Sequence, residues 1–148
     1  RSVDSAATEH GACGDLAEKS DRVARRRILS LDLPPNYFKP TFGEYQALSM
    51  LRKRVSHPIR LGEDQFNVGP DADSSFVTLL ATTTVPGLEL RWPSGEWRPA
   101  PPILDCILAN SGDMLTRWTN GRFMSSRTGV INSSGRDRYS FPLFIRPN

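Results

Sequence analysis

Two carboxylates lie two positions apart in this sequence, at Asp71 and Asp73. On a β-strand, residues two positions apart point to the same side, so both groups can face one site. Carboxylate oxygens suit hard cations such as Mg²⁺, Ca²⁺ or Mn²⁺. Without a cation, two close carboxylates resist double ionisation, and one of them can keep a proton for acid–base chemistry. The pair therefore predicts a hard-cation site, an acid–base pair, or simply two solvated or arginine-paired side chains.

Arg138 and Ser140 are a second pair of polar residues two positions apart. The planar guanidinium of arginine matches the two oxygens of a carboxylate, which makes this pair a candidate anchor for an acidic small molecule. The alternative is a structural arginine that pairs with an internal acid such as Asp113 or Asp137. Both interpretations stay open at the level of the sequence.

Nitrogen and sulfur ligands for a metal are scarce. The two histidines, His10 and His57, lie well before Asp71, and we expect both to be incidental surface groups rather than iron ligands. The two cysteines, Cys13 and Cys106, do not form a disulfide framework. Cys106 lies in an apolar stretch and is predicted to be a buried small hydrophobic residue.

The elements that must position these groups are mainly strands. Helical periodicity is confined to two early segments, residues 15–31 and 42–50. Predicted strands follow at residues 51–56, 76–84, 87–92, 96–98, 103–109, 122–126, 128–132 and 139–145. Two helices followed by seven or eight short strands predict a small barrel or sandwich with helices on one side.

Length and composition set the outer limits. The chain has 148 residues, of which 38% are hydrophobic, and this is enough for one domain with a core. We expect a flexible N-terminal segment over residues 1–14 and a single domain over residues 15–148. The formal net charge of +3 is too small to indicate a nucleic-acid partner. No apolar run approaches the roughly 20 residues that span a bilayer, so we predict a cytoplasmic protein without membrane contact.

Several segments resemble the isopenicillin N synthase-like family of Fe(II)/2-oxoglutarate oxygenases, in the same order and spacing. The likeness is carried by Gly69-Pro70 before Asp71, Phe76-Val-Thr-Leu-Leu80, Asn110-x-Gly112-Asp113, Trp118-Thr-Asn-Gly121, the stretch Ser125-Ser-Arg-Thr-Gly-Val130, and Arg138-x-Ser140. It covers roughly residues 30 to 148. The resemblance implies a mainly β fold, a double-stranded β-helix or jelly roll, with one or two N-terminal helices. Family members also carry a preceding N-terminal domain, so a partner or a homodimer is expected to cover exposed apolar surface.

The resemblance also assigns roles to individual positions. The family binds Fe(II) with two histidines and one carboxylate, and these positions align with Asp71, Thr128 and Asp73 in this chain. Both imidazoles are therefore replaced by oxygen groups, which are poorer ligands for iron than imidazole is. We accordingly expect no iron and no 2-oxoglutarate as cofactors, and we treat the three positions as vestigial. In the family, the residues at Arg138 and Ser140 hold the distal carboxylate of 2-oxoglutarate.

These expectations lead to one main hypothesis on function. The chain is predicted to be a degenerate oxygenase homologue that binds a small molecule, carboxylates included, and promotes redox-neutral cyclisation, isomerisation or pericyclic chemistry in secondary metabolism. Arg138, Ser140 and Thr128 would stabilise developing charge, and Asp73 completes the predicted catalytic set. Phe123 and Tyr139 are predicted to face the ligand, although a core role is the simpler reading of the aromatic residues. The alternatives are a non-catalytic binding or partner subunit, and a true oxidoreductase with an atypical metal site.

Overall fold

A computed structural model of the chain describes residues 31–34, 37–42, 50–51, 54–58, 66–81 and 83–147. The segment 1–14 and the helix expected over residues 15–31 lie outside these residues, except for Leu31. Most of the second expected helix lies outside them too. At its two ends, Phe42 closes a short 3-10 helix and Met50 begins a strand, so these two residues do not belong to one helix.

The described residues form ten strands, one 3-10 helix and one short α-helix. Their bounds are η1 Lys39–Phe42, β1 Met50–Leu51, β2 Arg54–Ser56, β3 Val68–Ala72, β4 Val77–Ala81, β5 Leu88–Arg91, β6 Trp97–Pro99, β7 Ile107–Ser111, α2 Asp113–Trp118, β8 Arg127–Val130, β9 Arg138–Ser140 and β10 Pro142–Ile145. One four-stranded sheet has the order β1-β10-β4-β7, a second has the order β3-β8-β5-β6, and β2 pairs with β9. Every strand pair is antiparallel.

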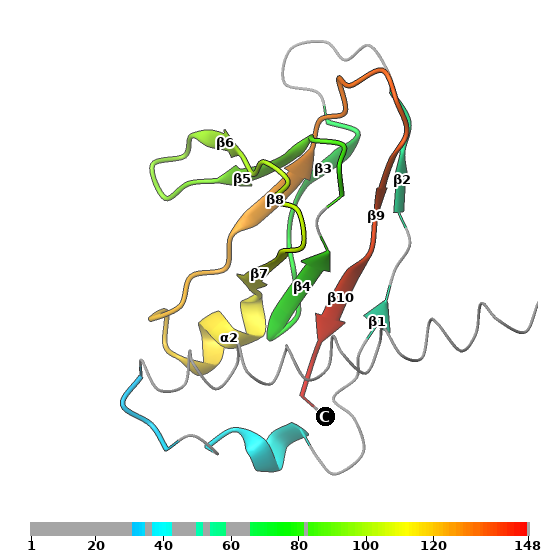
Figure 1. The fold of residues 1–148 in the computed structure, drawn as a ribbon. Helices are drawn as coiled ribbons and strands as arrows, with labels where there is room; N and C mark the ends of the chain where they lie inside the picture. The colour runs from blue at the N-terminus through cyan, green and yellow to red at the C-terminus, as the bar shows by residue number, and fades with distance from the viewer. Residues whose placement is uncertain are drawn as a thin grey trace, which may run out of the picture.

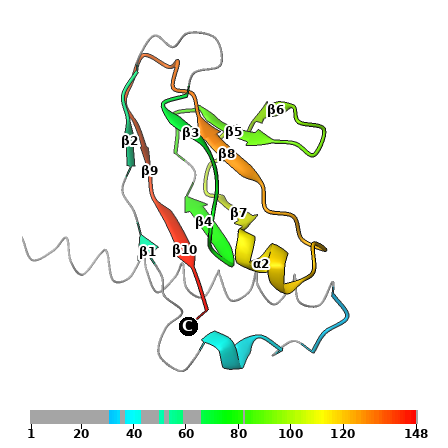
Figure 2. The same cartoon turned by 180° about the vertical axis from the view of Figure 1, so that it is seen from behind.

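The two four-stranded sheets interleave strands that are far apart in the chain (Figures 1 and 2). β9 continues into β10 along one side of the molecule, and the β5–β6 hairpin projects from the other side (Figure 1). This arrangement is the predicted mainly β jelly roll, and the fold class is confirmed. No helix among the described residues is long and apolar enough to cross a membrane.

The core is centred on β4, which lies between β10 and β7. The residues Phe76, Val77, Thr78 and Leu79 are each at most 3% exposed, which explains why this strand reads as a continuous apolar run rather than an alternating one. Phe76 contacts the rings of Phe38, Phe42 and Trp118 at centroid distances of 5.2 to 5.6 Å. These contacts attach η1 and α2 to one end of the sheet.

Three local predictions were wrong. Residues 122–126 form a turn and an irregular segment rather than a strand. The turn follows from Asn120 and Gly121, which take positive φ angles of 50° and 78° after α2 ends. Strand β7 begins only at Ile107, because a turn closed by the Cys106 N–H on the Ile103 carbonyl precedes it. Cys106 is therefore exposed and not buried.

Candidate functional site

Two of the three positions aligned with metal ligands face each other across neighbouring strands. Asp71 on β3 pairs with Thr128 on β8, and Thr128 also pairs with Leu90 on β5. Between Val68 and Asp71 the register of β3 shifts, because three residues there span the interval that two residues span on β8. Such a bulge re-aims a side chain and bends the strand. It places Asp71 on the same face of the sheet as Thr128.

Asp73 lies just after the end of β3 and is fixed by the segment that follows β7. Its Oδ2 accepts a hydrogen bond of 2.8 Å from the Nδ2 of Asn110, and its backbone carbonyl accepts one of 2.8 Å from the Asp113 N–H. Gly112, between Asn110 and Asp113, lies so close to this segment that a Cβ added to it would be 2.6 Å from the backbone carbonyl oxygen of Asp73. The motif Asn110-x-Gly112-Asp113 is therefore the support of Asp73. The sequence drew attention to this motif but gave Asn110 no role.

The donors available at the three positions are all oxygens. The Asp71 side chain is exposed, and its Oδ1 accepts the Ala72 N–H at 2.9 Å, while one oxygen of Asp73 is engaged by Asn110. No group of three or more His, Cys, Asp or Glu side chains converges among the described residues. Ferrous iron in this type of site is held by two imidazoles and one carboxylate. The residues at Asp71, Asp73 and Thr128 do not fit iron in that manner.

Arg138 and Ser140 point to the interior from β9. They are 5% and 6% exposed, whereas Tyr139 between them is 43% exposed. This alternation follows from the pleat of a β-strand. In the pairing with β2, Arg138 lies opposite Ser56 and Ser140 opposite Arg54. The prediction that Tyr139 lines the same site as Arg138 is not supported, because its side chain points away from Arg138, to the opposite face of the two-stranded β2–β9 sheet.

The guanidinium of Arg138 is buried without a carboxylate partner among the described residues. Its Nε has no hydrogen-bond partner, and burial lowers the pKa of the group from its ordinary value. Arginine nevertheless stays protonated in proteins. The sequence named Asp113 and Asp137 as candidate partners, but Asp113 is exposed and the Asp137 carboxylate lies 2.9 Å from Nδ1 of His57. Arg138 is therefore a candidate anion-binding residue.

Arg138 lines a pocket whose empty volume, open mouth included, is about 310 Å³. Its other walls are mainly apolar and come from three strands and the connections between them. They include Leu80 of β4, Leu88 of β5, Leu108 of β7, and Pro86, Pro101 and Pro102. The lining does not include Asp71, Asp73, Thr128 or Phe123. Phe123 instead packs against the hydrophobic core, as the simpler reading of the aromatic residues predicts.

The segment between β8 and β9, which leads into Arg138, is held by Asn132. This side chain is completely buried, and its Nδ2 donates to the carbonyls of Ser56 and Arg136 at 2.7 Å each. Its Oδ1 accepts from the N–H and the hydroxyl of Ser134 at 3.2 and 2.7 Å. Asn132 thus positions β9 against β2. Sequence reasoning missed it, although the Ser-Ser-Gly that follows Asn132 is a turn signal.

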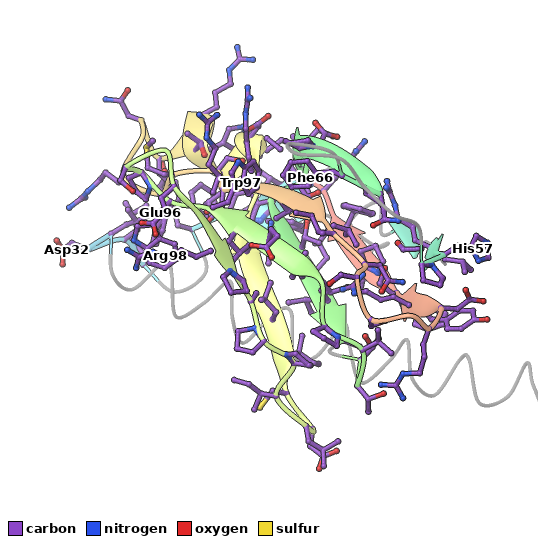
Figure 3. All side chains as sticks on the ribbon, turned by 90° about the horizontal axis from the view of Figure 1, so that it is seen from above. Asp32, His57, Phe66, Glu96, Trp97 and Arg98 are labelled. Atoms are coloured by element: carbon purple, nitrogen blue, oxygen red, sulfur yellow. The ribbon has the colours of Figure 1, made fainter. Side chains whose placement is uncertain are left out.

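The outer face of β8, behind Thr128, is covered by two aromatic rings. Phe66 and Trp97 lie side by side with ring centroids 5.1 Å apart (Figure 3). A Cβ added to Gly129 would be 2.7 Å from the ring of Phe66. Gly129 therefore allows Phe66 to pack directly on the strand that carries Thr128.

Comparisons with known proteins identify the family and support the fold. The sequence model of the 2OG-Fe(II) oxygenase superfamily matches residues 48–147. The 2-oxoglutarate-Fe(II) type oxidoreductase hxnY of Emericella nidulans is 38% identical over 124 residues, which are 81% of this chain and 35% of hxnY. Gibberellin 2-beta-dioxygenase 7 of Arabidopsis thaliana is 35% identical over 99 residues, or 67% of this chain and 29% of that protein. The chain thus spans about a third of the length of these relatives.

Solved structures show the same fold. Dioxygenase for auxin oxidation 1 from Arabidopsis thaliana, in a complex with 2-oxoglutarate, matches with a TM-score of 0.78 and 27% identity over 90% of this chain and 49% of its own. A full-length Neurospora crassa protein, in complex with alpha-KG and 5-formyluracil, matches with a TM-score of 0.89 and 24% identity over 99% of this chain and 50% of its own. The family match covers most of the sequence, and the predicted resemblance is confirmed: this chain belongs to the 2OG-Fe(II) oxygenase superfamily.

Proposed function

We propose that this chain is a family member that has lost the iron triad and uses its jelly-roll pocket to bind a small carboxylate and promote redox-neutral chemistry. The observation that carries the proposal is the pairing of Asp71 with Thr128, two oxygen side chains at the positions aligned with imidazoles, in a fold that keeps a buried Arg138. Neither iron nor 2-oxoglutarate would then be a cofactor.

The pocket is suited to holding a ligand in one conformation. Arg138 would bind the carboxylate through its planar fork, and the apolar walls would exclude water from the rest of the ligand. Holding a flexible molecule in a reactive conformation can account for a large part of a rate acceleration. Cyclisation, isomerisation or a pericyclic step in secondary metabolism moves bonds within one molecule and requires no oxidant.

Arg138 in the pocket lining and polar groups outside that lining would supply the remaining chemistry. Donors on Arg138, Ser140 and Thr128 can stabilise negative charge that develops during such a step. Asp73, oriented by Asn110, can accept or return a proton. We place this chemistry in the cytoplasm, because two cysteines in 148 residues do not make the disulfide framework of a small secreted domain.

Two measurements on the purified full chain test the proposal. After anaerobic incubation with Fe(II) and gel filtration, we expect far less than one iron per chain by metal analysis. In a chelator-treated sample, we expect pentanoate to bind in a calorimetric or NMR titration and Arg138→Gln to weaken binding about tenfold, the loss of ~1.4 kcal/mol expected for a charge-assisted contact. Arg136→Gln, an exposed arginine two residues away, is the matched control.

Stoichiometric iron together with oxygen consumption in the presence of 2-oxoglutarate would contradict the proposal and favour an oxidoreductase with an atypical metal site. Equal pentanoate affinity in the wild type and in Arg138→Gln would show that Arg138 does not bind the carboxylate.

A second candidate, a non-catalytic subunit or a homodimer, is favoured by one surface. Val55 and Tyr139 lie opposite each other on β2 and β9, and Phe141 follows two residues on; the three side chains are 41%, 43% and 39% exposed. Together they form an apolar outer face of the β2–β9 ribbon, which is suited to a protein partner. Sedimentation of the wild type and of Val55→Lys tests whether this face joins two copies of the chain. A wild-type dimer that becomes a monomer in Val55→Lys supports this candidate, and a monomer in both contradicts a homodimer.

A further inference from the structure

The anion pocket and the acidic positions are neighbours on one inner surface. Leu88 lines the pocket, and two residues further along β5 the same face presents Leu90, which pairs with Thr128. Leu108 also lines the pocket, and two residues further along β7 lies Asn110, which donates to Asp73. Same-face residues on a strand are about 7 Å apart. On β7, one step of the pleat leads from the pocket wall to Asn110, the hydrogen-bond donor to Asp73. On β5, one step leads to Leu90, whose partner Thr128 on β8 pairs in turn with Asp71 on β3.

The two ends of this surface carry opposite charge. Arg138, 5% exposed and with an unpartnered Nε, supplies the positive charge in the pocket. Asp71 and Asp73 supply the negative charges, and neither is in the ion pairs found among the described residues, which join His57 to Asp137 and Arg98 to Glu96. The nearest basic side chain along β8, Arg127, pairs with Ala72 and points to the opposite face from Thr128.

This charge order differs from the one that an oxygenase offers its co-substrate. A dicarboxylate anchored at Arg138 would direct its second carboxylate toward Asp71 and Asp73, and like charges brought together in this way reject a ligand. A ligand with a carboxylate at one end and a cation at the other meets a complementary charge at both ends. The apolar walls of the pocket beside Arg138 suit a short methylene chain.

We propose that the site selects a small zwitterion, an ω-amino carboxylate in chemical class, with its carboxylate on Arg138 and its ammonium group toward Asp71 and Asp73, and that it rejects dicarboxylates, 2-oxoglutarate among them. This inference rests on the proposed function, because it requires that no iron neutralises the two aspartates. It names the substrate class that the proposed redox-neutral chemistry would act on.

Three probes of equal carbon number test it on the chelator-treated full chain: 5-aminopentanoate, pentanoate and glutarate. Titrations at neutral pH should give the tightest binding for 5-aminopentanoate, about tenfold tighter than pentanoate, which corresponds to ~1.4 kcal/mol for one added charge pair. Glutarate should bind most weakly. This ranking is measured on the wild type, so it does not depend on the folding of any variant.

Variants then assign the preference to the aspartates. Asp71→Asn combined with Asp73→Asn keeps the shape and hydrogen-bonding capacity of both side chains and should abolish the advantage of 5-aminopentanoate over pentanoate while strengthening glutarate. Asp105→Asn, an exposed aspartate outside the site, is the matched control and should change nothing. Circular dichroism and the melting temperature of each variant check that it is folded.

The outcomes separate this inference from the proposed function. If glutarate binds as tightly as 5-aminopentanoate and Arg138→Gln weakens both, the anion anchor stands and the zwitterion preference is overturned. If none of the three probes binds, both fail. If added Fe(II) makes 2-oxoglutarate the preferred ligand, a metal occupies the site and both are again overturned. A preference for 5-aminopentanoate that survives the double Asn substitution also overturns the inference, since the aspartates would not cause it.

Discussion

Asp71 and Thr128 lie directly opposite each other on the antiparallel strands β3 and β8, although they are 57 positions apart in the chain. Side chains at such positions have Cβ atoms about 4.5–5.5 Å apart, close enough to share one ion if their chemistry permits. The bulge in β3 preserves this meeting point. Two imidazoles placed at these positions would therefore lie side by side on one face of the sheet.

Restoring two histidines at these positions should restore iron binding. The double variant Asp71→His with Thr128→His supplies two imidazoles beside the carboxylate of Asp73, and we expect about one Fe(II) per chain by metal analysis, as the two-histidine, one-carboxylate arrangement binds iron. The matched control is Ala72→His with Arg127→His, because these residues also pair on β3 and β8 but face the other side of the sheet. An equal Fe(II) content in both variants would show that iron binding does not depend on the face of the sheet to which the two histidines point.

Three glycines should respond to alanine in a graded order. A Cβ at Gly112 would lie 2.0 Å from the Ser75 carbonyl oxygen, which belongs to the backbone, so Gly112→Ala should cost more than about 4 kcal/mol of unfolding free energy. At Gly129 the obstacle is the Phe66 ring at 2.7 Å, and a cost of about 1–3 kcal/mol is expected.

Gly69 is the control for both, because nothing lies within 4 Å of its added Cβ, and its replacement should change stability by less than about 0.5 kcal/mol. Denaturant unfolding measures all three. Adding Phe66→Leu should recover part of the loss in Gly129→Ala and none of the loss in Gly112→Ala; equal recovery would contradict the assigned contacts.

Asn132→Ala should destabilise the fold and weaken ligand binding together. The substitution removes four hydrogen bonds made by a completely buried side chain and leaves the carbonyl of Ser56 without that donor, at a cost of about 3 kcal/mol. Because these bonds hold the segment that leads into β9, pentanoate affinity should fall even at temperatures where the variant remains folded. Ser133→Ala, at the exposed neighbouring position, should leave both the melting temperature and the affinity unchanged.

Glu89 gives the protein a pH dependence that can be removed. Burial raises the pKa of this carboxyl above its ordinary value of 4.5, so the folded state binds its proton more tightly than the unfolded state. Its contribution favours folding below pH 4.5 and is lost as the pH rises through the folded-state pKa. Glu89→Gln should therefore be more stable than the wild type at neutral pH, by no more than about 0.3 kcal/mol because solvent screens this partly exposed carboxyl, and this difference should vanish in acid. A difference that stays constant with pH would mean that desolvation of the charge is not its cause.

Much of the fold could be predicted from the sequence. The run around β4 contains the apolar, β-branched residues that favour strands, and β5 and β6 flank the turn signal at residues 93–95. The positions of the chemical groups followed from their order in the family motifs. The failures were local. Residues 122–126 have strand-like composition but follow the positive-φ turn at Asn120 and Gly121, and Cys106 lies in an apolar stretch that is bent by a turn at Asp105, whose φ is 59°. Composition averages over such backbone conformations and does not detect them.

The sequence by itself determined which atoms are present at the site: oxygens at Asp71, Asp73 and Thr128, and a guanidinium at Arg138. Only the tertiary structure decided how they meet. It joins Asp73 to Asn110 across 37 residues, buries Arg138 without a partner for its Nε and turns Tyr139 outward. The identity of a ligand atom is a property of one residue, whereas desolvation and long-range hydrogen bonding depend on which distant strands the closed chain brings together.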